Sequence, residues 1–235
     1  LFYGDLGPFA MYPSLYPRLS YAIPRDFTPV TRLFNTPVLL VVPAVSKVSN
    51  VAELVWSAKA GDGLSYGSYG IGSQPHVWTE QFGRLTGARL NHVPYQGAGP
   101  ALQDLIGRRL DFMVDVIASS LPLVRDGRLK AIAVIGSTRR SELLPTVPTL
   151  TEAGYASLDQ PGWNGVVMRS GTPVAALSVI RQHLSMAVQS QEVTARYAPL
   201  GLQAAAMPSD AFAAFVESEI RRWGAAIREA KVSIE

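Results

Sequence analysis

The feature that most constrains this chain is an alternation of short apolar runs with amphipathic stretches between Val38 and Ile135. The apolar runs predict strands at 38–42, 64–69, 90–95, 110–116 and 128–135. The stretches between them predict helices at 50–60, 75–86, 100–108 and 119–126, with Ser49 or Asn50 capping the first. Strands that alternate with helices in this way are typical of βαβ units and a largely parallel sheet.

The flanking regions have a different composition. Residues 1–37 contain six prolines, Pro8, Pro13, Pro17, Pro24, Pro29 and Pro37, which predict short turns and extended pieces without a long helix or central strand. Residues 143–161 are again rich in Pro, Thr and Gly and are interpreted as a connector. A strand at 162–168 and helices at 173–189 and 209–230 follow, with Ser209 as the N-cap of the last helix.

Composition excludes several classes of protein. A net charge of +3 on 235 residues is far from the clustered positive charge of a nucleic-acid-binding protein. No apolar run approaches the roughly 18–20 residues that cross a bilayer. The chain has no cysteine, which excludes a disulfide framework and a thiolate metal site and suits an oxidising compartment. The first residues lack a signal peptide's features and are interpreted as those of a processed or truncated chain.

The candidate site consists of loops that follow three neighbouring strands. In a parallel sheet, such loops meet at the carboxyl edge, where ligands bind. Glycines allow the backbone to approach a ligand, and each following helix offers unpaired N–H groups to an anion. Ligand-binding candidates in these loops are Ser68, Tyr69, Gly72, Ser73, Gln74, His76, Gly97, Ala98, Gly99 and Asp115. The pattern predicts a site for a small carboxylate that uses no Lys or Arg, and Ser73→Ala or Gly97→Val is expected to weaken binding.

Two of these residues have alternative interpretations. His76, in the first turn of its helix, either reaches the ligand or is a structural histidine. Asp115 accepts hydrogen bonds either from loop N–H groups or from a hydroxyl or amine of the ligand. Both pairs of alternatives stay open at this point.

Catalytic motifs match poorly. Gly63–Gly67 fits G-x-S-x-G around Ser65, but a nucleophile elbow needs a strand before the serine and a helix directly after it. The loop at Gly70 and Gly72 has Pro75 where a dinucleotide-binding fingerprint needs its third glycine. His76, His92 and His183 lack metal-ligand spacing. These motifs therefore favour neither a nucleophilic serine nor a dinucleotide cofactor, and the histidines do not indicate a metal site.

Three segments resemble the Bug family, the periplasmic solute receptors of tripartite tricarboxylate transporters in bacteria. They are YGSYGIGSQPHVWTEQF, LNHVPYQGAGPALQDLIGRRLDFMVD and LPLVRDGRLKAIAVIGSTRRSELLPTVPTLTEAG, with VPYQGAGPAL and LPTVPTLTEAG the most specific pieces. The resemblance extends from Met11–Pro17 and Arg25–Pro29 to the C-terminal helix.

The resemblance implies a type II periplasmic binding protein of the Venus-flytrap kind, with two α/β lobes joined by a hinge. Lobe 1 would comprise residues 1–37 and 151–235, and lobe 2 residues 38–150, with the hinge near Val38–Pro43 and again after Ile135. The implied function is capture of a small organic acid or amino acid in the periplasm for membrane permease subunits, without catalysis. A regulator's ligand-sensing domain and, less well supported, a serine hydrolase using Ser65 are the alternatives.

Two departures from the family pattern concern lobe 1. The chain lacks the family's initial strand and glycine-rich loop, so the first lobe is expected to be incomplete. Asp5 lies in a turn expected to face the cleft, where it would repel a second ligand carboxylate, pair with an amine, or point to solvent. Trp163 is expected to face the ligand from the same lobe.

Overall fold

The chain divides into two compact units, each with its own sheet. The computed structural model describes residues 1–137 and 139–234. Unit 1 comprises Leu1–Thr36 and Gly162–Glu235, and unit 2 comprises Pro37–Pro161. The chain therefore passes between the units after Thr36, next to the expected Val38–Pro43, and after Pro161, well beyond the end of the strand at Ile135.

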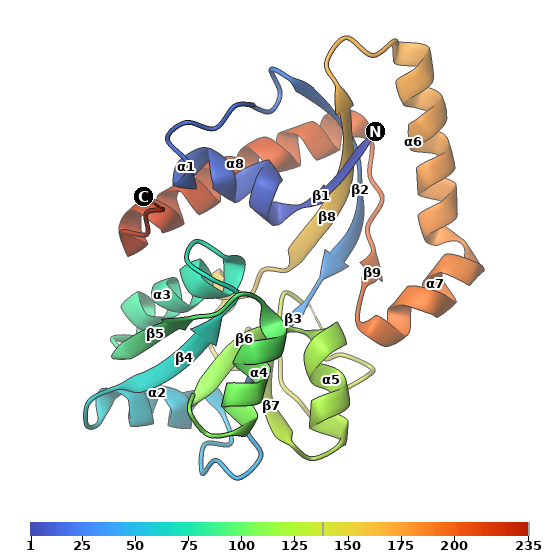
Figure 1. Cartoon of the computed structure of the whole chain (residues 1–235). Coiled ribbons are helices and arrows are strands. Elements are labelled where there is room, and N and C mark those ends of the chain that lie inside the picture. Colours follow the sequence, from blue (N-terminus) through green and yellow to red (C-terminus); the bar gives the residue numbers. More distant parts are fainter. Residues whose placement is uncertain (138, 235) are drawn as a thin grey trace. The chain divides into compact units, whose positions relative to one another are not determined.

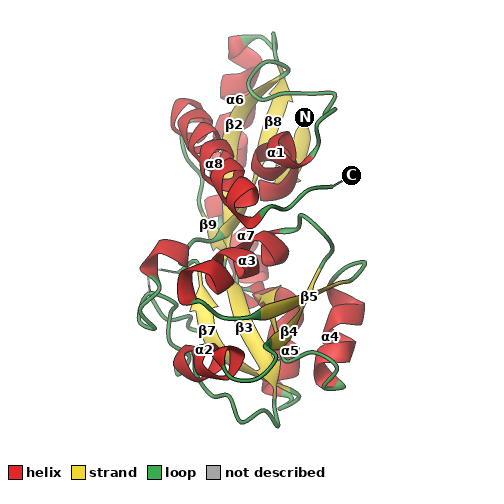
Figure 2. Ribbon diagram, turned by 90° about the vertical axis from the view of Figure 1, so that its left-hand side faces the viewer, coloured by secondary structure: helices red, strands yellow, loops and turns green. Residues whose placement is uncertain are grey.

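Unit 1 is built on a four-stranded antiparallel sheet. Its strands, in spatial order, are β1 (Phe2–Asp5), β8 (Gly162–Arg169), β2 (Phe27–Thr36) and β9 (Gln203–Ala204). Its helices are η1 (Gly7–Met11), α1 (Tyr12–Leu15), α6 (Val174–Gln189), α7 (Gln191–Tyr197), η3 (Ala198–Leu200) and α8 (Ser209–Ala230). Both views show α8 with α1 on one side of this sheet and α6 on the other (Figures 1 and 2).

The proline-rich start contains a strand that composition argued against. β2 lies inside the sheet between β8 and β9, although Pro29 lacks the N–H that a central strand needs. Two features accommodate Pro29: the β2–β8 register shifts between Pro29 and Thr31, and β9 pairs only with Phe34 and Asn35. At Pro29 the strand is therefore an edge strand beside a bulge, where proline is tolerated.

Unit 2 contains the predicted alternation of strands and helices. Its sheet has the order β5 (Leu90–Pro94), β4 (Leu64–Ser68), β6 (Phe112–Val116), β3 (Val38–Pro43) and β7 (Leu129–Ile135). The helices are α2 (Val51–Lys59), α3 (Gln74–Thr86), α4 (Ala98–Ile106), α5 (Ile117–Arg125) and η2 (Ala156–Leu158). β4 runs parallel to β5 and β6, and only β3, antiparallel to β6 and β7, points the other way in this sheet.

The core of unit 2 explains how the helices are placed. Leu39 and Val41, alternate residues of the fully buried β3, share one apolar cluster with Leu105 of α4 and Leu121 of α5. Alternate residues of a strand point to one face, so α4 and α5 cover the same face of the sheet. The helices α4 and α5 begin two residues earlier than the sequence predicts, at Ala98 and Ile117.

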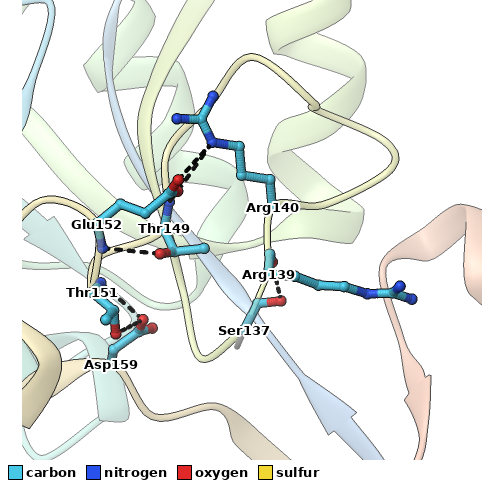
Figure 3. Close-up of polar contacts among 7 residues, drawn as sticks. All are labelled: Ser137, Arg139, Arg140, Thr149, Thr151, Glu152 and Asp159. Atoms are coloured by element: carbon cyan, nitrogen blue, oxygen red, sulfur yellow. Dashed lines mark hydrogen bonds and ion pairs between the residues drawn. The ribbon is translucent and has the colours of Figure 1, made fainter.

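The segment after β7 belongs to unit 2, whereas the sequence placed residues 151–161 in lobe 1. The Asp159 carboxylate accepts hydrogen bonds from the backbone N–H groups of Gly136, at 2.5 Å, and Thr151, at 2.9 Å. The Glu152 carboxylate accepts from the Thr149 N–H and from Arg140, and Figure 3 shows these contacts. These hydrogen bonds attach residues 149–159 to the end of β7. Composition alone does not predict such contacts.

One smaller expectation concerns the N-cap of α8, and another concerns membrane-spanning helices. The Ser209 hydroxyl donates to the Val30 carbonyl, and Pro208 occupies the N-cap position of α8 instead of Ser209. Within the described part of the chain, none of the helices has the length and apolar character needed to cross a membrane.

Candidate functional site

Three loops of unit 2 follow strands that end at the same edge of its sheet. Ser68 at the end of β4 is in register with Pro94 at the end of β5, and β6 runs parallel to β4. The loops that lead into α3, α4 and α5 therefore start from neighbouring strand ends, as the sequence predicted (Figure 1).

The loop between β4 and α3 is closed by its own polar groups. Gly70 and Gly72 have φ angles of +123° and +78°, a backbone conformation that favours glycine. The Ser73 hydroxyl donates to the Gly70 carbonyl at 2.7 Å, and the buried Ser68 hydroxyl bonds both polar backbone groups of Gly70. Both predicted serines thus hold the turn, while the Ile71 side chain at its tip is 55% exposed.

Two histidines lie against each other behind this loop. The His76 and His92 rings are stacked with centroids 3.8 Å apart and an 8° angle between their planes. The His76 Nδ1 accepts the Gly72 N–H at 3.0 Å, which assigns the ring proton of the neutral form to Nε2. The His92 Nε2 lies 2.7 Å from the Ser68 hydroxyl oxygen.

The electrostatics favour neutral imidazoles. Burial lowers the pKa of His76, against the opposing effect of the Glu80 charge. Burial and the neighbouring His76 lower the pKa of His92 to about 4. His76 is only 7% exposed and its Nδ1 is engaged, so the structural interpretation fits its ring better than a direct ligand contact.

Asp115 is the centre of a buried hydrogen-bond network. Its carboxylate is fully buried and accepts hydrogen bonds from the hydroxyls of Tyr69, Ser119 and Ser120. The Tyr69 hydroxyl also accepts the Val116 N–H at 3.1 Å. These side-chain donors are neither of the partners that the sequence suggested for Asp115. The network joins the end of β4 to the end of β6 and the first turn of α5.

Among the described residues, several backbone N–H groups at the starts of α3 and α4 have no hydrogen-bond partner. The first turn of a helix leaves its N–H groups without intrahelical partners. Pro75 and Pro100 have no backbone N–H group. The N–H groups without an intrahelical partner are therefore those of Gln74 and His76 on α3 and those of Ala98 and Gly99 on α4. A Cβ atom built on Gly97 or Gly99 meets no atom within 4 Å, so the backbone there is accessible. The partly buried Gln74 side chain has no hydrogen-bond partner among the described residues.

The two candidates in unit 1 do not resemble ligand contacts. Trp163 is 1% exposed, stacks with Phe9, and donates its Nε1–H to Glu219 at 2.8 Å, so it is a core residue and the expectation that it faces a ligand is wrong. The exposed Asp5 carboxylate accepts the Gly7 N–H at 2.9 Å, which is an ordinary turn contact.

Sequence reasoning missed the partners of the predicted residues. His92 was considered only as a metal ligand, and Tyr66, in register with it on β4, was not considered at all. Tyr66 stacks on His92 and donates its hydroxyl to Glu80 at 2.5 Å. Aligning the two predicted strands in parallel would have brought Tyr66 and His92 side by side.

Ser65 lacks the geometry of a hydrolase nucleophile. It is the second residue of β4, at the end of the strand opposite the loops, and its hydroxyl donates to Asp111 at 2.8 Å. A nucleophile elbow places the serine on a sharp turn between strand and helix, which is not where Ser65 lies.

Two α/β units, one of which has helix N-termini at the edge of its sheet, are the architecture of periplasmic binding proteins. The family model described as the tripartite tricarboxylate transporter family receptor (TctC) matches residues 5–232. The chain belongs to this family of receptors.

Curated relatives and solved structures agree with this assignment. The chain is 32% identical over 223 residues to protein BugT of Bordetella pertussis, covering 94% of this chain and 68% of the relative. It is 32% identical to a UPF0065 protein from the tcbD–tcbE intergenic region of a Pseudomonas species, covering 93% of this chain and 65% of that protein. The chain thus spans about two thirds of the length of these relatives.

Among solved structures, similarity covers nearly the whole chain. A Rhodopseudomonas palustris protein with adipate aligns with a TM-score of 0.88 and 29% identity, covering 99% of this chain and 78% of that one. The periplasmic binding protein BugD aligns at 0.84 and 26% identity, with coverages of 99% and 78%. MatC of R. palustris, with bound malate, aligns at 0.80 and 30%, with coverages of 96% and 78%. The fold is that of a periplasmic binding protein, as the sequence predicted.

Proposed function

We propose that this receptor captures a small carboxylate, amino acids included, at the starts of α3 and α4. The observation that carries the proposal is the accessible backbone at Gly97 and Gly99, next to a second helix N-terminus at the same sheet edge. Each helix N-terminus carries about half a positive charge and suits an anion. Residues 68–76 and 97–100 contain no Lys or Arg, so backbone N–H groups would supply the recognition.

The chemistry seen in relatives supports the same ligand class. Two solved structures at 29% and 30% identity contain adipate and malate, both dicarboxylates. The transport partner follows from the family: membrane permease subunits of a tripartite tricarboxylate-type transporter, with the receptor working in the periplasm and without catalysis. The alternative, a ligand-sensing domain of a regulator, would use the same carboxylate site.

Titration calorimetry with adipate, malate and the uncharged diamide of adipic acid tests the proposal. We expect saturable binding of one or both acids and no binding of the diamide, because only the carboxylate is an anion. Binding of the diamide as tightly as adipate, or of no acid in a wider carboxylate and amino-acid series, would overturn the proposed ligand class.

A matched pair of variants on α4 tests the location. Gly99→Ala adds a methyl group where no protein atom lies within 4 Å, so folding should be unaffected while a ligand on the first turn is displaced. We expect the affinity for the bound acid to fall about tenfold or more, since one lost charge-assisted hydrogen bond is worth about 1.5–3 kcal/mol. Gln103→Ala, at an exposed position on the same helix, is the control and should leave affinity unchanged.

The structure also shows why the two substitutions suggested by the sequence are less informative. Ser73→Ala removes the hydroxyl that closes the turn on Gly70. Gly97→Val forces a branched residue into a φ of +120°. Either variant would weaken binding by distorting a loop, whether or not the ligand contacts the altered residue.

A further inference from the structure

The stacked imidazoles of His76 and His92 connect the candidate binding loop to the sheet. His76 accepts the Gly72 N–H from one side of the loop, and His92 contacts Ser68, which bonds Gly70 on the other side. The turn that precedes α3 is therefore held at two points by one pair of rings that face each other at 3.8 Å.

Protonation of His76 reverses the polarity of its bond to the loop. The neutral ring accepts at Nδ1, whereas an imidazolium carries a proton on both nitrogens and accepts at neither. The Gly72 N–H would then face another donor and lose its partner. Because the rings are stacked, a charge on one also disfavours a charge on the other.

The groups around the pair offer limited compensation for a positive charge. On α3, Glu80 is the charged residue that acts on His76, and its carboxylate already accepts the Tyr66 hydroxyl. From the sheet, Tyr66 of β4 stacks on His92, and Phe112 of β6 stacks on Tyr66. The pair thus lies between one engaged carboxylate and a column of uncharged rings.

We propose that His76 is a positioning residue that acts through Gly72 and holds the loop in its binding geometry only while the stacked pair is neutral. The predicted effect on ligand binding rests on the proposed function, whereas the predicted effect on the loop conformation does not. Acidification then releases the Gly72 N–H, disorders the start of α3 and weakens binding of an anion there.

The direction of the pH effect follows from the lowered pKa values of both rings. In the unfolded chain a histidine has a pKa near 6.5, so below that pH the unfolded state binds more protons than the folded state. Stability therefore decreases as the pH falls from about 6.5 toward the folded-state value, which for His92 is about 4. At neutral pH both rings are uncharged and the loop is closed.

Nuclear magnetic resonance of the ligand-free protein tests the loop part. The chain has only three histidines, so the ring signals of His76 and His92 can be assigned by single substitutions. We expect the His76 and His92 ring signals to titrate below pH 6.5, the pKa of an ordinary histidine, and the Gly72 amide signal to move together with His76. A Gly72 amide that stays in place while His76 titrates, or a His76 that titrates at or above pH 6.5, would overturn the proposal.

The variant His76→Asn separates positioning from simple structural support. Its side-chain oxygen can replace Nδ1 as an acceptor for the Gly72 N–H, and it cannot be protonated in this range. We expect its Gly72 amide signal to stay constant between pH 7 and pH 4. If this variant does not fold, the titration of the natural protein still decides the matter.

Adipate affinity measured at pH 7 and at lower pH, in the natural protein and in His76→Asn, tests the functional part. Below the pKa of the pair, affinity should fall about tenfold more per pH unit in the natural protein than in the variant. Protonation of adipate affects both proteins alike and cancels in the ratio. Equal pH profiles would overturn the positioning role, whereas absence of adipate binding at pH 7 would count against adipate as the ligand and leave the amide titration as the decisive test.

Discussion

At the residue scale, Tyr69 is the side chain that connects two of the candidate loops. Its hydroxyl donates to Asp115 and accepts from the Val116 N–H, so a single oxygen joins the ends of β4 and β6. Burial, and then the Asp115 charge, raise the pKa of Tyr69 above its usual value, which keeps the hydroxyl protonated as a donor. A buried carboxylate that depends on hydroxyl donors is sensitive to the loss of any of them.

Replacing Tyr69 by Phe should therefore reduce the free energy of unfolding by about 1–3 kcal/mol, because Asp115 loses a donor and the Val116 N–H loses its acceptor. Urea denaturation measures the loss. Tyr95→Phe is the matched control, since the Tyr95 hydroxyl donates to Asp104, which also pairs with the exposed Arg109. Equal decreases in the free energy of unfolding in the two variants would contradict the prediction that the Tyr69 hydroxyl stabilises the protein more than the Tyr95 hydroxyl.

At the element scale, the attachment of α8 to the sheet of unit 1 depends on one buried carboxylate. Glu219 is 5% exposed and accepts hydrogen bonds from the indoles of Trp163 on β8 and Trp223 on α8, at 2.8 and 3.3 Å. It also forms a bidentate pair with Arg222. The hydrogen bond to Glu219 holds the Trp163 indole in the core of unit 1. Trp163 has this position although it lies at the start of β8, just after the chain passes from unit 2 to unit 1.

Glu219→Ala should destabilise the protein by about 3–5 kcal/mol, because it leaves Arg222 and two indole N–H groups without their acceptor. Glu217→Ala, on the same helix, removes only an exposed pair with Arg221 at 3.9 Å and should cost less than about 1 kcal/mol. Thermal and urea denaturation compare the two. Similar losses would mean that the Glu219 contacts contribute no more than a surface ion pair.

At the scale of the whole molecule, the two units have separate cores and two covalent connections. A ligand that binds only the folded protein stabilises it by mass action. A carboxylate present at about 100 times its Kd adds about 2.7 kcal/mol. For a chain of this size, that corresponds to an increase in Tm of about 5–10 °C.

A thermal-shift screen against carboxylates and amino acids should reveal ligands by this increase. The Gly99→Ala variant is the control, and the shift with the same ligand should be smaller at equal concentration. A shift of the same size in the variant would place the bound acid elsewhere on the protein.

The sequence by itself determined the elements of unit 2 and the edge at which its loops meet. The Asn50 cap is an example, because its side chain accepts the Glu53 N–H at 2.9 Å as the local pattern predicts. Such features depend on residues a few positions apart, whose interactions are set by the backbone geometry of a single element.

Only the tertiary structure decided which residues meet across elements. The contacts of His76 with His92, of Tyr69 with Asp115 and of Trp163 with Glu219 join positions 16, 46 and 56 residues apart. Their formation depends on strand register and on how helices pack on a sheet, and no local pattern encodes either. For that reason the sequence indicated the candidate loops, while the tertiary structure showed that several of their polar side chains hold the loops themselves. The ligand site at the first-turn N–H groups of α3 and α4 is our proposal.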